Sequence, residues 1–115
     1  MSQKTVALAL SEPKYAYDPH LLSHFSFTKG GFAKFDEMDA PFVSPAAHVA
    51  LKGFYGWGGF GGSWFVFHPS KRVGLGYVPT GLAVRGLGGA TSDGLLSAVA
   101  AVLQDDPIVA AKPVE

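Results

Sequence analysis

A chain of 115 residues has room for one domain with a modest hydrophobic core. Its nine basic and nine acidic side chains cancel, so the total charge does not indicate a nucleic acid, an anionic membrane or a strongly charged substrate. The absence of cysteine excludes disulfides, thiolate nucleophiles and thiolate metal ligands.

Basic side chains are concentrated in the central part of the sequence. Between Asp39 and Asp93 there is no acidic residue, and four cations occur there: Lys52, Lys71, Arg72 and Arg85. They are too widely spaced to follow a phosphate backbone, so we expect no nucleic-acid partner. We interpret them as solvated positions, with a surface that faces an anionic group as the lesser alternative.

The N-terminal residues 1–24 are poorly defined by their pattern. The apolar run at the start is five residues long, too short for a signal-peptide core, and no run approaches the roughly 20 apolar residues of a membrane span. We therefore expect a soluble cytoplasmic chain without a membrane partner. Asp18 and Pro19 predict a short helix over residues 20–24. His20 and His24 would share a face of it, but no third ligand is near, so we predict no metal site.

The central residues predict strands. Aromatic side chains recur over residues 25–35, where Gly30 and Gly31 indicate either a bulge or a turn between two strands. Residues 36–45 are typical of a loop, and residues 47–54 have no clear assignment. Residues 63–68 form an aromatic-rich run that predicts a buried strand, and residues 73–78 predict the second strand of an antiparallel hairpin.

A helix is expected near the C-terminus. Thr91, Ser92 and Asp93 offer capping oxygens, and apolar residues then recur at spacings of three and four up to Leu103. We therefore predict an α+β fold: an antiparallel sheet of three to five strands with this helix packed on one face. It would be a single partial domain, with the sheet and helix over residues 25–105 and a tail over residues 106–115.

A glycine-rich stretch lies between these elements. Its residues 56–61 match the dinucleotide-binding pattern Gly-x-Gly-x-x-Gly, which requires a helix directly after it to face the pyrophosphate. A predicted strand follows instead. The pattern therefore does not indicate a nucleotide, and we predict no cofactor.

The stretch from Tyr55 to Pro79, with Trp57-Gly58-Gly59 followed by glycines and a hairpin, resembles the C-terminal sheet of the class C beta-lactamase-like family. This family includes penicillin-binding proteins, beta-lactamases and esterases, and some of its esterases carry Trp-Gly-Gly on an inner strand. The resemblance covers residues 25–103 and implies a beta-lactamase/transpeptidase-like fold. It also implies serine-dependent hydrolysis or acyl transfer at a small ester or amide, through an acyl-enzyme.

The same resemblance assigns substrate-binding roles to four consecutive residues. Trp57 would line the pocket for the acyl or leaving group, and Gly58 and Gly59 would let the substrate approach the strand. The backbone N–H of Phe60 would complete an oxyanion hole. Such a donor stabilises charge that appears only in the tetrahedral intermediate.

The sequence departs from the family at its nucleophile. Ser11 and Lys14 match the family's Ser-x-x-Lys motif, but no long apolar helix follows, so we attribute the match to chance and assign no catalytic residue. Asparagine, required by the family's Tyr-x-Asn or Ser-x-Asn element, does not occur. We therefore expect a C-terminal fragment that is inactive alone, and that associates with the missing N-terminal part of the hydrolase domain or with itself.

The alternative from another class is a noncatalytic interaction module. Its partner would contact an exposed aromatic face of the strands, formed by Trp57, Phe60, Trp64, Phe65 and Phe67.

Overall fold

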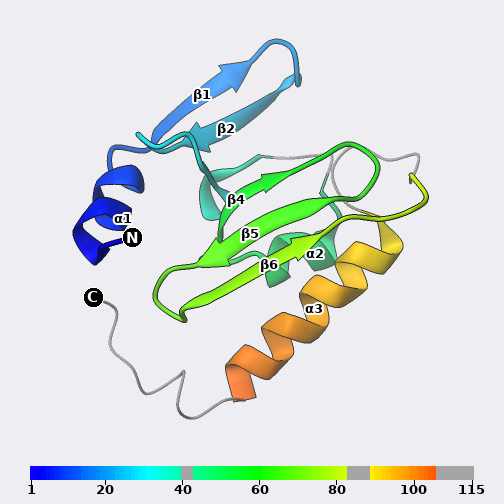
Figure 1. Ribbon diagram of the computed structural model, residues 1–115. Coiled ribbons are helices and arrows are strands. Elements are labelled where there is room, and N and C mark those ends of the chain that lie inside the picture. Colours follow the sequence, from blue (N-terminus) through cyan, green and yellow to red (C-terminus); the bar gives the residue numbers. More distant parts are fainter. Residues whose placement is uncertain (40–42, 83–88, 106–115) are drawn as a thin grey trace.

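Most of the chain folds into one antiparallel sheet accompanied by helices (Figure 1). The structure is a computed structural model that describes residues 1–39, 43–82 and 89–105. In chain order its elements are α1 (Gln3–Ala9), β1 (Lys14–Asp18), β2 (Ser23–Phe27), β3 (Ala33–Lys34), the 3-10 helix η1 (Phe35–Glu37), α2 (Pro45–Ala50), β4 (Tyr55–Gly58), β5 (Trp64–His68), β6 (Val73–Tyr77) and α3 (Ala90–Asp105). The expected tail, residues 106–115, lies outside the described residues. Among those described, no helix is long and apolar enough to cross a membrane.

The six strands pair in the order of the sequence, β1-β2-β3-β4-β5-β6, which is more strands than the three to five we expected. Each pair is antiparallel, and the predicted hairpin is confirmed as β5 and β6, with Val66 opposite Leu75. Residues 25–35 form two strands joined by a turn, one of the two alternatives. Because β3 has only two residues, the hairpin of β1 and β2 projects away from β4, β5 and β6 (Figure 1).

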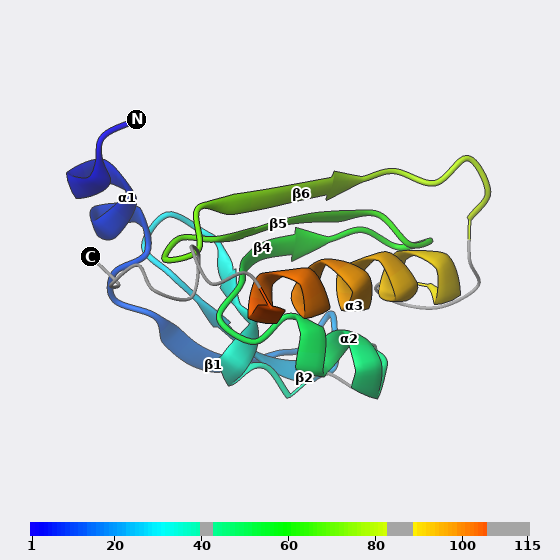
Figure 2. The ribbon, with the colours of Figure 1, turned by 90° about the horizontal axis from the view of Figure 1, so that it is seen from below.

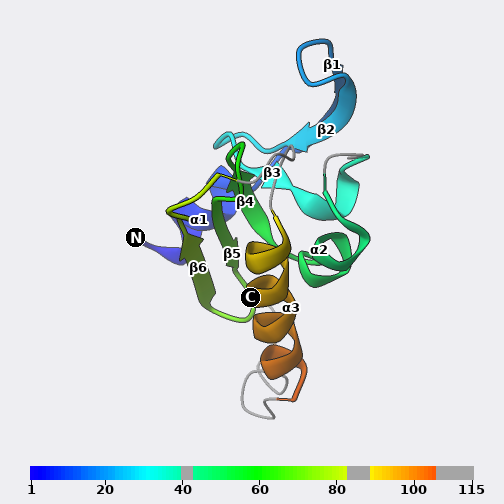
Figure 3. The ribbon, with the colours of Figure 1, turned by 90° about the vertical axis from the view of Figure 1, so that its right-hand side faces the viewer.

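The helices α2 and α3 cover one face of β4, β5 and β6, as Figures 2 and 3 show. Side chains alternate between the two faces of a strand, so Trp64 and Val66 of β5 join the core on the helix side. Leu96 and Leu103 of α3 belong to the same core, which confirms the predicted amphipathic helix on one face of the sheet. Phe65 and Phe67 lie on the opposite face of β5.

The helix α2 was not assigned from the sequence, although it has both a cap and a core contribution. The hydroxyl of Ser44 accepts a hydrogen bond from the backbone N–H of Ala47, and Pro45 occupies the first helical position, where its missing N–H costs nothing. Ala47 and Ala50 are buried. The Ser44 hydroxyl also donates to Asp93 Oδ2 at 2.7 Å, so one serine joins α2 to the first turn of α3.

Two expectations about helix starts are wrong. The residues after Asp18 do not form a helix: its Oδ1 accepts from the N–H groups of His20 and Leu21 in a turn, and the chain then enters β2. At α3 the helix begins at Ala90, before the expected capping residues. Ser92 donates back to the Gly89 carbonyl oxygen. The side-chain oxygens of Asp18 and Ser92 do form local hydrogen bonds, but neither of them caps a helix in the predicted way.

Candidate functional site

The four residues expected to bind substrate lie at the end of β4 and at the start of the loop to β5. β4 is an inner strand, paired to β3 on one side and to β5 on the other. Trp57 is half-buried, and its ring packs against Phe25 and Phe27 at centroid distances of 5.5 and 5.4 Å. These contacts hold the indole at the junction between β4 and the projecting hairpin. Phe60, two residues after the strand, is 70 % exposed.

The missing side chains of Gly58 and Gly59 leave space that the chain itself uses. A Cβ on Gly58 would stand 2.7 Å from Cζ3 of Trp64, and one on Gly59 would stand 2.2 Å from the Ser63 hydroxyl oxygen. The N–H of Gly59 donates to the Ser63 carbonyl oxygen at 2.9 Å and closes the turn. Trp64 therefore blocks the helix side of β4, and a substrate can reach these glycines only from the face that carries Trp57 and Phe65.

Ser11 and Lys14 do not share a helical turn. Ser11 follows the end of α1, and its hydroxyl donates to the Leu8 carbonyl oxygen at 2.6 Å. Glu12 then adopts a left-handed backbone with φ of 52°, and Lys14 begins β1. A Ser-x-x-Lys nucleophile needs its serine and lysine one helical turn apart on the same face. The geometry here gives Ser11 the role of a helix-end hydrogen-bond donor.

The aromatic face expected for an interaction module is only partly formed. Trp64 is 2 % exposed and points into the core, so its inclusion in that face was wrong. Phe65 is 61 % exposed on the opposite face. There it contacts Phe67, which stacks on Tyr55 at 6.2 Å. The alternation of β5 separates these side chains, since residues 64 and 65 must face opposite ways.

A groove that was not predicted from the sequence lies on this same face. It has a volume of about 760 Å³ and runs between α1 and the outer face of β4, β5 and β6. Its apolar part is lined by Val6, Leu10, Tyr55, Phe65 and Phe67, and its polar end by Asp36, His68, Ser70 and Arg72. Figure 1 shows α1 at the end of the sheet where β5 turns into β6. No motif marks this groove, because its walls come from distant parts of the sequence.

The imidazole of His68 organises the turn at the polar end. Its Nδ1 lies 3.3 Å from the backbone nitrogen of Lys71 and 3.0 Å from the Ser70 hydroxyl. Because a backbone N–H can only donate, Nδ1 is an acceptor and the ring proton of the neutral form is on Nε2. Burial, and secondarily the charge of Lys71, lowers the pKa of His68, against a smaller opposing influence of Asp36. His68 is therefore neutral at pH 7 and accepts from Ser70.

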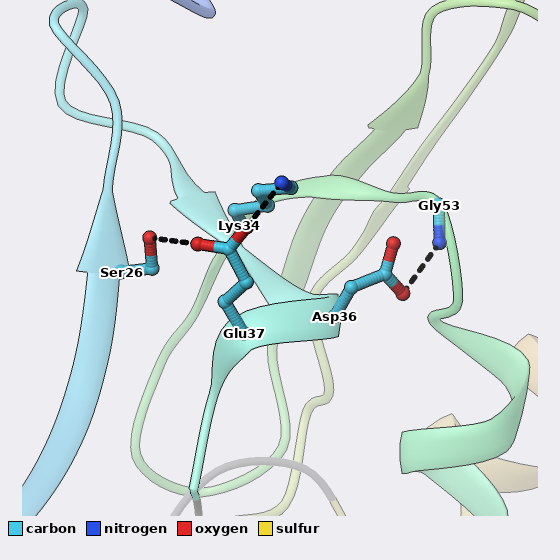
Figure 4. A network of polar contacts seen from close by, with 5 residues as sticks. All are labelled: Ser26, Lys34, Asp36, Glu37 and Gly53. Carbon is cyan, nitrogen blue, oxygen red and sulfur yellow. Dashed lines mark hydrogen bonds and ion pairs between the residues drawn. The ribbon is translucent and has the colours of Figure 1, made fainter. Parts of the chain in front are cut away.

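A second polar network joins η1 to the sheet (Figure 4). The buried Ser26 hydroxyl donates to Glu37 Oε2 at 2.8 Å, and the Lys34 ammonium donates to Glu37 Oε1. The Lys34 and Ser26 hydrogen bonds lower the pKa of Glu37, and the bond to Glu37 raises the pKa of Lys34. Beside this network, Asp36 Oδ1 accepts from the Gly53 N–H at 3.0 Å. Ser26 is fully buried, so this network positions η1 and offers no nucleophile to a substrate.

The described residues contain no metal-binding cluster, and the comparisons with known proteins found no match. Within residues 1–39, 43–82 and 89–105, no three His, Asp or Glu side chains are grouped so that they could hold a metal ion. No family model, no curated protein and no solved structure matches the chain. The geometry of its own residues must therefore carry any functional proposal.

Proposed function

We propose that this chain is the C-terminal, substrate-binding portion of a beta-lactamase-related serine hydrolase that acts on a small ester or amide. The observation that carries the proposal is the position of Trp57-Gly58-Gly59 at the end of an inner strand, followed by the β5–β6 hairpin and a terminal helix on one face of the sheet. That order agrees with the sequence resemblance.

In the proposed reaction the strand end binds the acyl group and the chain supplies no nucleophile. A serine from a segment outside this sequence attacks the substrate carbonyl, and the N–H of Phe60 donates to the oxyanion. Trp64 closes the helix side of β4, so the carbonyl lies on the side of Trp57. There the half-buried indole limits the size of the acyl or leaving group.

Co-expression tests this proposal. The chain would be produced with a segment that carries a Ser-x-x-Lys helix, taken from the neighbouring reading frames of the source genome, and hydrolysis of a short-chain nitrophenyl ester would be measured. We expect activity only when both are present, and none from the chain alone or from its Ser11→Ala variant. If the segment were equally active without this chain, the proposal would fail.

A pair of variants at Phe60 tests the oxyanion donor. Phe60→Pro removes the backbone N–H, whereas Phe60→Ala keeps it and removes the same exposed ring. Loss of one such donor typically lowers kcat about 10²- to 10³-fold. We expect that loss from Phe60→Pro alone, with both variants equally stable to urea. Equal activity of the two would remove Phe60 from the mechanism.

The exposure of Phe60 and Phe65 favours a second candidate, a noncatalytic module that binds a protein partner through these side chains. A portion of a larger domain should associate or unfold over a broad range, because it leaves sheet edges and apolar surface uncovered. Sharp two-state unfolding of a monomer would instead favour the module.

A further inference from the structure

The groove between α1 and the sheet has the form of a binding site for a linear apolar chain. Its floor is a connected aromatic row, in which Phe67 contacts Phe65 at 6.2 Å, Tyr55 at 6.2 Å and Phe32 at 5.1 Å. Gly74, which also lines the groove, presents no side chain on β6. The volume of about 760 Å³ lies within the usual range for small-molecule sites, roughly 300 to 1,000 Å³.

The helix that forms the other wall is incompletely packed. α1 has seven residues, none of them buried, and isolated helices of that length are marginal in water. It is held at its C-terminal end, where the N–H of Gly30 donates to the Ala9 carbonyl oxygen at 2.7 Å and that of Lys29 to the Ser11 carbonyl oxygen at 2.9 Å. A ligand between α1 and the aromatic row would bury the apolar sides of both.

The polar end of the groove carries a cation, Arg72, for which the described residues provide no ion-pair partner. Arg72 lies in the β5–β6 turn with a left-handed backbone, φ 55°, and no carboxylate of the described residues forms an ion pair with it. Asp36 at the same end already accepts the Gly53 N–H, and His68 is neutral. Arg72 therefore lines an apolar groove, and no side chain in the part of the chain that the structure describes occupies its N–H donors. A guanidinium can bind a carboxylate through two parallel hydrogen bonds in one plane. One arginine alone carries too little charge to follow the phosphates of a nucleic acid.

We propose that this groove binds an amphipathic monocarboxylate, with the alkyl chain on the aromatic row and the carboxylate at Arg72. This site contains none of the residues from Trp57 to Phe60, so it does not rest on the proposed hydrolase function. The proposal gives Arg72, one of the four central cations, an anionic ligand. From the sequence alone we interpreted these cations as solvated side chains.

The test is titration calorimetry of the full chain with decanoate, decan-1-ol and decyltrimethylammonium, all below their aggregation limits. We expect saturable one-to-one binding of decanoate, weaker binding of the alcohol and none of the cation. Arg72→Met should weaken decanoate binding about 10- to 100-fold, the usual range for a lost charge-assisted hydrogen bond, and leave the alcohol unaffected. Lys52→Met, an exposed cation outside the groove, should change neither.

Further variants locate the ligand. Phe65→Ser, at an exposed position that should tolerate a polar side chain, should weaken both decanoate and decan-1-ol by a similar factor. Equal affinity of the acid and the alcohol, equal effects of Arg72→Met and Lys52→Met, or no binding of decanoate would each overturn the proposal. A fully retained affinity in Phe65→Ser would place the ligand elsewhere and overturn it as well.

Discussion

The indole of Trp64 occupies the space next to Gly58 in which any other residue at position 58 would place its Cβ, 2.7 Å from Cζ3 of the ring. Gly58→Ala should therefore displace a core tryptophan that is 2 % exposed. Overpacking of this kind costs about 1 to 3 kcal/mol, which a urea unfolding curve would show as a lower midpoint with an unchanged slope.

Gly76→Ala is the matched control for that prediction. Gly76 lies on β6, two strands away, and a Cβ there would meet nothing within 4 Å. Alanine should be neutral or stabilise by up to about 1 kcal/mol, because glycine loses more backbone freedom on folding. Equal destabilisation by both variants would show that strand glycines are generally intolerant and that Trp64 is not the cause.

Ser44→Ala should destabilise the chain more than an ordinary loss of a helix cap. The variant removes the cap of α2, worth about 1 kcal/mol, and also the donor to Asp93. Asp93 is 9 % exposed, and its Oδ1 has no hydrogen-bond partner in the part of the chain that the structure describes. We expect a total loss of about 2 to 4 kcal/mol in chemical denaturation, since hydrogen bonds to charged groups are worth about 1.5 to 3 kcal/mol.

Ser2→Ala provides the comparison for Ser44→Ala, because Ser2 caps α1 with the same geometry on an exposed helix. Its loss should cost no more than about 1 kcal/mol. If Ser44→Ala cost no more than Ser2→Ala, the bond between Ser44 and Asp93 would contribute nothing to stability.

Stability should fall as the pH drops below neutrality, and His68 should account for part of the fall. The pKa of His68 in the folded state is below the unfolded value of 6.5, so the unfolded chain takes up its proton first. The stability contributed by the neutral ring is complete above pH 6.5 and is lost as the pH falls through the folded pKa. His68→Asn keeps an acceptor near the Lys71 N–H but cannot titrate. Thermal melts at pH 7.5 and 5.5 should differ less for this variant than for the natural chain.

Glu37 should produce a separate change in more acidic solution. The pKa of its carboxyl is below the unfolded value of 4.5, chiefly because of Lys34 and then Ser26. Its contribution is therefore present above pH 4.5 and is lost as the pH falls through the folded pKa. The effect should be under about 1 kcal/mol, since both charged side chains are partly exposed. Glu37→Gln should flatten stability between pH 5 and 3, and an unaltered acid limb would contradict this assignment.

The strands and the helix with strong periodicity could be predicted from the sequence. The aromatic run before His68 predicts a buried strand, and the apolar spacing up to Leu103 predicts an amphipathic helix. In both cases the pattern lies within the segment itself. β1 could not be predicted, because four of its five residues are exposed and its strand character comes from pairing with β2. α2 has only six residues, too few for periodicity, although Ser44 followed by Pro45 was a usable start signal.

The candidate sites, too, could be predicted from the sequence only in part. Trp57 to Phe60 could be selected from their residue types, but only the structure shows that Trp64 and Ser63 fill the space beside the two glycines. The groove could not be predicted, because residues as distant in the sequence as Leu10 and Phe67 line it together only after tertiary folding. The opposite orientations of Trp64 and Phe65 were predictable in principle, since they are adjacent on one strand.

The order of the strands has a consequence for how the molecule assembles. Since each strand pairs only with its neighbours in the sequence, most β pairings close a short connection, and the exception is β3 with β4, whose connection holds η1 and α2. The hairpins bring together residues that are close in the sequence, so they are expected to form before the β3–β4 pairing. During synthesis, the hairpin of β1 and β2 could pair soon after it leaves the ribosome. Each later strand would then find a template already in place, and α3 would complete the core last.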